Sequence, residues 1–185
     1  ATVNLSVLTM KAMVFCREQN ILTSSKNTIM NRTVKTLLRK PADRVPIFEH
    51  VIDSRFIKFA TGTVYSKSLH MEPEDHMKLA DFMNMDLLTV GYISRVPNTS
   101  TPELFKNVKR DQHDDFLKKV DNYINALKNR NDLGLNVYIH GPFDSTYLSM
   151  GYENFFLNCH DNLKFVEEMM DFFIEDAICI TKKLL

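Results

Sequence analysis

The sequence lacks an excess of charge of either sign. Its 185 residues carry 23 basic and 23 acidic side chains, so the formal net charge is zero. Binding to nucleic acid depends on clustered Lys and Arg, and so does binding to anionic membrane surfaces. The composition therefore predicts neither nucleic acid nor a membrane as a partner.

Cysteine is scarce and long apolar runs are missing. The three cysteines, Cys16, Cys159 and Cys179, are an odd number and lie far apart, which argues against a disulfide framework. No stretch approaches the roughly 20 apolar residues that a membrane-spanning helix needs, and residues 1–15 lack the features of a secretory signal. We expect a soluble, cytoplasmic protein with free thiols.

The signature motifs of several enzyme classes are also absent. With only five glycines, the chain has no Gly-rich phosphate loop and no G-x-S-x-G turn around a nucleophilic serine. It has neither H-E-x-x-H nor C-x-x-C, the spacings typical of zinc sites. The sequence therefore predicts no metal site within this chain.

Three short apolar runs alternate with helical patterns. The runs cover residues 47–52, 87–93 and 135–140 and are predicted to be strands, and the near-continuous apolar run at 87–93 is typical of a parallel strand covered on both faces. Helical spacing or helix-start signals predict helices before Pro41 and over 53–60, 73–83, 111–129, 142–150, 152–158 and from 162 onward, with Asp161 as a capping residue. Alternation of this kind indicates parallel βαβ units and the α/β class.

Polar side chains follow each apolar run. The carboxyl ends of parallel strands meet at one rim, where ligands bind. Imidazoles and carboxylates there can transfer protons, and a guanidinium can bind an anionic substrate. We therefore assign catalytic roles to His50, His140, Asp144 and Tyr147, and substrate-binding roles to Arg55, Tyr92, Ser94 and Gly141. The alternative is that this rim is polar only because its loops face water.

Two stretches resemble the uroporphyrinogen decarboxylase superfamily. The first is 31–38 (NRTVKTLL) followed by 41–46 (PADRVP), which is similar to the helix and the D-R-V-P sequence ahead of the family's first strand. The second is 140–151 (HGPFDSTYLSMG), which is similar to the family's G-x-P-[FW]-[ST] segment and the short helix after it. Both occur in the family's order, and the resemblance covers roughly residues 30–185.

The resemblance implies a fold and a set of cofactors. Family members form a (β/α)8 TIM barrel, so residues 30–185 would be its N-terminal half, and residues 1–29 an N-terminal extension. The superfamily contains uroporphyrinogen decarboxylases and cobamide-dependent methyltransferases. The latter use a zinc ion whose His and Cys ligands lie mostly in the second half. For a complete enzyme the resemblance thus implies zinc and a corrinoid, with no cofactor held by this chain alone.

The sequence departs from the decarboxylase pattern at two places. The Arg-rich segment that clamps substrate carboxylates is replaced by 53–58 (DSRFIK), in which Arg55 is only a partial counterpart. The Asp at the end of the family's second strand is replaced by Ile93 or Ser94, whereas Tyr147 matches a tyrosine of the helix after the third strand. Both losses argue against porphyrinogen decarboxylation, because the substrate's carboxylates would lack partners.

Three functions remain open. The favoured one is methyl transfer in concert with a corrinoid protein. The second is a carboxy-lyase acting on a tetrapyrrole-like substrate, and the third is a non-catalytic half-barrel that associates with another chain. Three strands cannot close a barrel, and they leave sheet edges and apolar helix faces uncovered. We therefore expect a homo-oligomer, or a longer chain that supplies the remaining strands.

Overall fold

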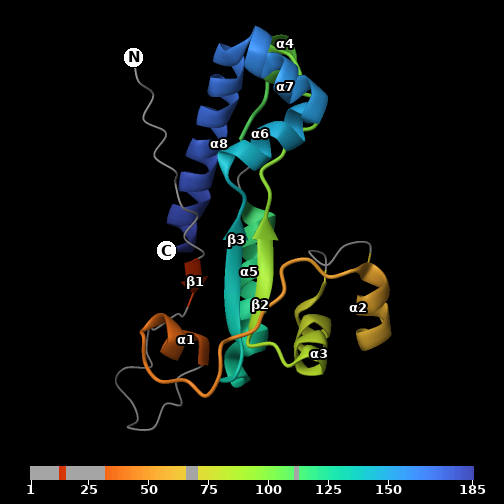
Figure 1. Cartoon of the computed structure of the whole chain (residues 1–185), viewed down its shortest axis with the longest axis vertical. Helices are drawn as coiled ribbons and strands as arrows, with labels where there is room; N and C mark the ends of the chain where they lie inside the picture. Colours follow the sequence, from red (N-terminus) through yellow and green to blue (C-terminus); the bar gives the residue numbers. More distant parts are fainter. Residues whose placement is uncertain (1–12, 16–31, 66–70, 111–112) are drawn as a thin grey trace.

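The chain forms a small sheet with helices beside it and beyond one end (Figure 1). The computed structural model describes residues 13–15, 32–65, 71–110 and 113–185. The strands are β1 (Met13–Phe15), β2 (Leu87–Tyr92) and β3 (Gly134–Ile139), in the order β1-β3-β2. Strands β2 and β3 are parallel, and β1 pairs with β3 in the antiparallel sense.

Helices account for most of the remaining described residues. They are α1 (Arg32–Leu37), α2 (Ser54–Thr61), α3 (Pro73–Met83), α4 (Pro102–Phe105), α5 (Asp114–Ala126) with the 3-10 turn η2 (Leu127–Asn129), α6 (Pro142–Met150), α7 (Tyr152–Asp161) and α8 (Leu163–Leu184). Strands β2 and β3 are parallel, and α5 lies between them in the sequence. This arrangement confirms the mixed α/β class that the alternating pattern predicted.

Local signals set several helix boundaries as expected. Pro73 occupies the first turn of α3, where its missing N–H is not needed, and Glu74 and Asp75 lie at the positive end of the helix dipole. Helix α2 ends at Gly62, whose φ of 80° is a left-handed conformation that glycine adopts without strain. Asp161, however, belongs to the end of α7, and α8 begins after Asn162 without a side-chain cap. The predicted capping role of Asp161 is therefore wrong.

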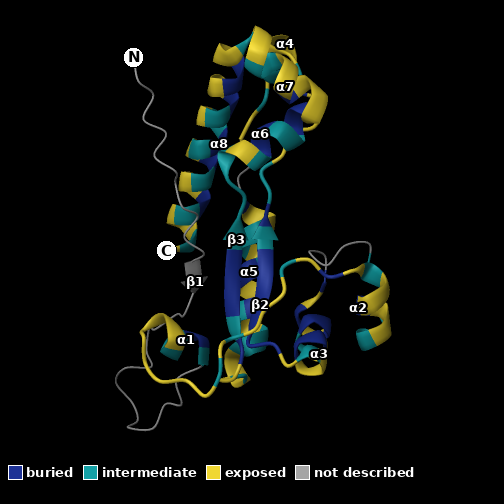
Figure 2. Cartoon of the chain, viewed as in Figure 1, coloured by how far each residue is buried: buried dark blue, intermediate teal, exposed yellow. Residues whose placement is uncertain are grey.

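The two faces of the parallel pair differ in chemistry. In the observed register Leu88 lies beside Leu135 and Val90 beside Val137, and these four side chains join the core formed with α3 and α5. The strands are buried along most of their length (Figure 2). Side chains alternate between faces along a strand. The opposite face therefore carries the neighbours Thr89 and Asn136, followed by Gly91 and Tyr138.

A second core lies beyond the carboxyl ends of the strands. There α6 and α7 pack on the first half of α8, with Phe155, Phe165, Met169 and Phe173 buried among them. Helix α8 then continues back toward the sheet, where its Leu184 packs against the first core (Figure 1). One long helix thus connects both cores.

The predicted first strand at 47–52 is wrong, because these residues form no strand. Ile47 does exchange hydrogen bonds with Asp86, just before β2, but the pairing goes no further. Val51 is 74% exposed, so the apolar run lacks the neighbouring surface on which strand formers pack. The second sheet edge also differs from expectation, because β1 occupies it in the antiparallel sense. Residues 13–15 had been assigned to an extension, and the rest of 1–29 lies outside the described residues.

None of the helices in the described ranges combines the length and apolar character that crossing a bilayer requires. Cys159 and Cys179 are free thiols, as predicted, whereas Cys16 lies outside the described residues.

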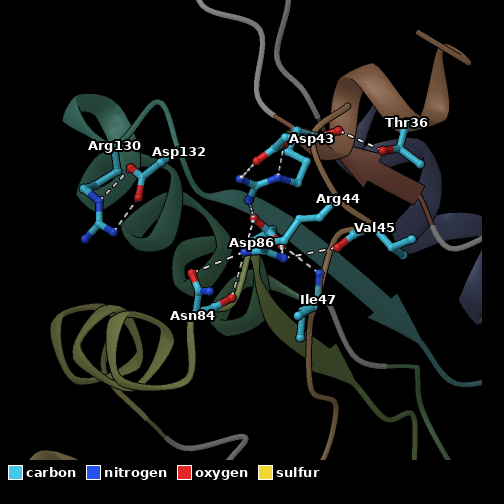
Figure 3. A network of polar contacts seen from close by, with 10 residues as sticks. Thr36, Asp43, Arg44, Val45, Ile47, Asn84, Asp86, Arg130 and Asp132 are labelled. Carbon is cyan, nitrogen blue, oxygen red and sulfur yellow. Dashed lines mark hydrogen bonds and ion pairs between the residues drawn. The ribbon is translucent and has the colours of Figure 1, made fainter. Parts of the chain in front are cut away.

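A buried carboxylate fastens the segment around 41–47 to the amino end of β2 (Figure 3). Asp86 is 3% exposed and accepts hydrogen bonds from Arg44 Nη1 at 2.6 Å, from the backbone N–H of Ile47 at 2.7 Å and from Arg32. Arg32 also forms an exposed ion pair with Asp43. The D-R-V-P sequence that suggested a family therefore has a structural role here, because its Arg neutralises a buried charge.

We predict that Asp86→Ala lowers the free energy of unfolding by about 1–3 kcal/mol, because it removes the buried acceptor shared by Arg32, Arg44 and the backbone N–H of Ile47. Urea denaturation measures this change. Asp43→Asn is the matched control, since that side chain is 68% exposed, and its effect should be much smaller. Equal effects of the two variants would contradict a stabilising role of the hydrogen bonds to Asp86.

His76 is a second buried polar group of the first core. Its Nδ1 lies 3.2 Å from the hydroxyl of Tyr123, which itself donates to the carbonyl oxygen of Met71 at 2.9 Å. Because the Tyr123 hydroxyl already donates its only proton to Met71, Nδ1 of His76 carries a hydrogen and donates it to the Tyr123 oxygen. Burial, aided by the positive charge of Lys119, lowers the pKa of His76 to about 4.

This shift predicts a pH dependence of stability. Between about pH 6.5 and pH 4 the unfolded chain binds a proton at His76 that the folded chain does not bind, so stability falls as the pH falls. The loss attributable to this group is about 3 kcal/mol. We expect His76→Asn, which retains an N–H donor near the Nδ1 position, to flatten the curve by about that amount in denaturant titrations. Parallel curves for the two proteins would show that His76 does not titrate in this way.

Candidate functional site

His140 and Asp144 lie together at the carboxyl end of β3. The strand ends at Ile139, Gly141 precedes the first residue of α6, and Pro142 starts that helix. This sharp junction places Asp144 in the first turn of α6, where the helix dipole favours a carboxylate. Its Oδ2 lies 3.5 Å from Nδ1 of His140. The sequence prediction that these two residues share a rim is therefore consistent with the structure.

Two further rings complete what we call the His140 cluster: His50, Tyr138, His140 and Asp144. The centroid of the Tyr138 ring lies 4.4 Å from that of His50 and 4.8 Å from that of His140, in both cases edge to face. His50 reaches this place from the segment before α2. Gly91 lies beside Tyr138 in the register and contributes no side chain at this level.

The cluster combines partial burial with one negative charge. Burial lowers the pKa of His140, and nearby His50 acts in the same direction, whereas Asp144 opposes the shift. Burial also raises the pKa of the Tyr138 phenol, and the Asp144 carboxylate adds to this effect. These shifts favour a neutral imidazole at His140 and a protonated phenol at Tyr138 at neutral pH.

Tyr147 lies one helical turn beyond Asp144 on the side of the second core. Its ring stacks on that of Tyr152 with centroids 4.7 Å apart, and it also contacts Phe143 and Phe155. The Tyr152 hydroxyl, burial and then the Asp144 carboxylate raise the pKa of Tyr147 to about 12. Tyr147 is thus adjacent to the cluster and shares its carboxylate.

Tyr92 belongs to the helix-covered side of the sheet. Its hydroxyl donates to Oδ2 of Asp176 on α8 at 3.1 Å, and Oδ1 of the same carboxylate lies 2.8 Å from Nε2 of His113. Asp176 and His113 are each 1% exposed. Tyr92 also packs on Phe116 of α5. These contacts fix α8 to the end of β2, which is a structural role.

The other predicted residues are spread more widely. Arg55 is 92% exposed on α2, and its guanidinium pairs with Asp53, whose pKa it helps to lower. Ser94 follows β2 and is partly exposed, and the carbonyl oxygen of Gly141 accepts the N–H of Ser145 at 3.1 Å. The structure therefore brings His50, His140 and Asp144 together around Tyr138, with Tyr147 adjacent, and places Arg55 and Tyr92 elsewhere.

Sequence reasoning missed Tyr138, Asn136 and Thr89. Oγ1 of Thr89 and Oδ1 of Asn136 are buried, and within the described part of the chain neither has a hydrogen-bond partner. A signal was available, because 136, 138 and 140 alternate with apolar residues and so share one face of the strand. The prediction considered only the end of this strand and so did not use the alternation.

The described residues do not form a metal site, because no three His, Cys, Asp or Glu side chains among them lie in a grouping that could hold an ion. A zinc centre would need ligands from outside these ranges. The chemistry available to the cluster itself is proton transfer by a neutral imidazole with a carboxylate nearby, and ligand binding by aromatic rings.

Comparison with protein-family models, with curated proteins and with solved structures found no match to this chain.

Proposed function

We propose that residues 30–185 are the first part of a (β/α)8 barrel and that the face of β2 and β3 carrying Thr89, Asn136 and Tyr138 is its interior. The observation that supports this most strongly is the difference between the two sheet faces. One is apolar and packs on α3 and α5, as the outer face of a barrel strand does. The other is polar and ends in the His140 cluster at the carboxyl end.

The activity we propose is methyl transfer together with a corrinoid protein, within the uroporphyrinogen decarboxylase superfamily. Each of the two motifs on which that resemblance rests has a structural role in this chain. The D-R-V-P sequence anchors the chain at the amino end of β2 through Arg44, and the Gly141-Pro142 turn delivers Asp144 to the opposite end. A corrinoid would supply the carrier of the methyl group.

Each member of the His140 cluster then has a role. His140, neutral at working pH, accepts or delivers a proton at its ring nitrogen, and the Asp144 carboxylate lies 3.5 Å from its Nδ1, where it can pair with the protonated ring. Tyr138 contacts both imidazole rings and contributes its phenol to the cluster. His50, from the segment before α2, packs against the Tyr138 ring and completes the cluster.

The carboxy-lyase alternative has weaker support. A substrate with several carboxylates needs several cationic donors at the rim. Arg55, the residue assigned to that task, is 92% exposed and engaged with Asp53. The cluster itself carries the negative charge of Asp144, which would repel such a substrate.

A specific observation favours association with another chain as a second candidate function. Phe56, Phe59 and Phe82 contact one another with ring centroids 5.9–6.3 Å apart, yet Phe59 is 74% exposed and Phe82 56%. Clustered apolar side chains at a surface are typical of interaction sites. This patch lies on α2 and α3, so association there is compatible with a ligand site at the end of β3.

We predict that the chain binds methylcobalamin, used as a probe for a protein-bound corrinoid, and that His140→Gln weakens this binding about tenfold. Equilibrium dialysis followed by the absorbance of the corrin ring measures both constants. His160→Gln is the control, because His160 is 90% exposed and lies on α7, and it should bind as the unaltered chain does. Absence of binding, or equal binding by all three proteins, would contradict the proposed function.

A further inference from the structure

We propose that the His140 cluster is a binding site for a small organic cation, of the tertiary or quaternary ammonium class. The inference rests on the proposed function and names the class of substrate that the same site accepts. Its basis is the juxtaposition of one carboxylate, Asp144, with the rings of Tyr138, His140 and His50 at the carboxyl end of β3.

The electrostatic effect of Asp144 reaches several groups at this rim. Asp144 acts on His140, Tyr138 and Tyr147 alike, so its field extends across the cluster. The Asp144 side chain is 29% exposed, so a solute can reach it. Its distance of 3.5 Å from His140 is too long for a strong hydrogen bond, and a neutral imidazole cannot cancel its charge.

In the described part of the chain, neither Arg55 nor Arg95 is bonded to Asp144. The Arg55 guanidinium pairs with Asp53 at the start of α2. Arg95, which follows β2, donates to the carbonyl oxygen of Leu148 at 3.0 Å. An anionic substrate would therefore meet a carboxylate without an opposing guanidinium, whereas a cation would meet an acceptor that is ready to pair.

The rings add a second, independent attraction. The face of an aromatic ring attracts a cation that lies within about 6 Å of its centroid, and aromatic enclosures are the general means of recognising alkylated ammonium groups. Tyr138 is flanked edge to face by both imidazoles, at interplanar angles of 63° and 78°, so the three rings form a non-planar surface. Such a surface suits a tetrahedral, alkylated cation better than a flat one.

The test is a solution NMR titration of the full chain at about pH 8, where imidazoles are neutral. Tetramethylammonium chloride is the cationic probe, sodium pivalate is an anion of similar size, and tert-butanol is the neutral counterpart. We expect saturable shifts of the His50, Tyr138 and His140 ring resonances with tetramethylammonium, and about tenfold weaker binding in Asp144→Asn. Asp144→Glu should retain binding.

The control is Asp161→Asn. Asp161 also lies beside an imidazole, with 2.6 Å between its Oδ1 and His160 Nδ1, but that pair is exposed. This variant should bind the cation as the unaltered chain does. A dispersed amide spectrum shows whether each variant is folded. If Asp144→Asn does not fold, the affinity of Asp144→Glu for the cation still tests the inference.

The outcomes separate this inference from the proposed function. If pivalate shifts the same ring resonances and binds at least as tightly as tetramethylammonium, the cluster is a binding site but the inferred cation class is wrong. If no probe shifts these rings while methylcobalamin still binds in dialysis, the cation inference fails alone. If neither methylcobalamin nor any probe binds, both fail.

Discussion

The parallel register between β2 and β3 is the constraint on which the rest of the structure depends. Six residue pairs, from Leu87 beside Gly134 to Tyr92 beside Ile139, decide which side chains share a face. One face becomes apolar and holds α3 and α5, and the other becomes polar and leads to the His140 cluster. A slip of one residue in either strand would move every side chain of that strand to the opposite face.

Buried carboxylates hold the two ends of this parallel pair. At the amino end Asp86 binds Arg32, Arg44 and the backbone of Ile47, and so fixes the segment that later carries His50. At the carboxyl end Asp176 joins α8 to Tyr92 and His113. Burying a charge is costly unless it is paired, so each carboxylate enforces one arrangement of its neighbours. The proposed site lies at the carboxyl end, on the sheet face opposite to that of Tyr92.

Much of the fold could be predicted from the sequence. The runs at β2 and β3 and the helix signals at Pro73 and Gly62 depend on local chemistry, which a sequence displays directly. The segment at 47–52 looked like a strand for the same reason, but strand formation needs a partner along its whole length, and within this segment the pairing toward β2 is limited to Ile47, which bonds to Asp86. For the site, position after a strand found His140 and Asp144, whereas His50 was assigned to the rim on the basis of a strand that does not form. It failed for Tyr92, because being at a strand end does not say which face a side chain takes.

The most direct test of this account is an NMR measurement of which rings meet. Nuclear Overhauser contacts should join the ring protons of Tyr138 to those of His50 and of His140, because the centroids lie 4.4 and 4.8 Å apart. Tyr92 should instead show contacts to His113 and Phe116. Contacts between the His50 ring and the side chains of Leu88 or Val90 would contradict the account, since they would place His50 on the helix-covered face and leave the polar face without its cluster.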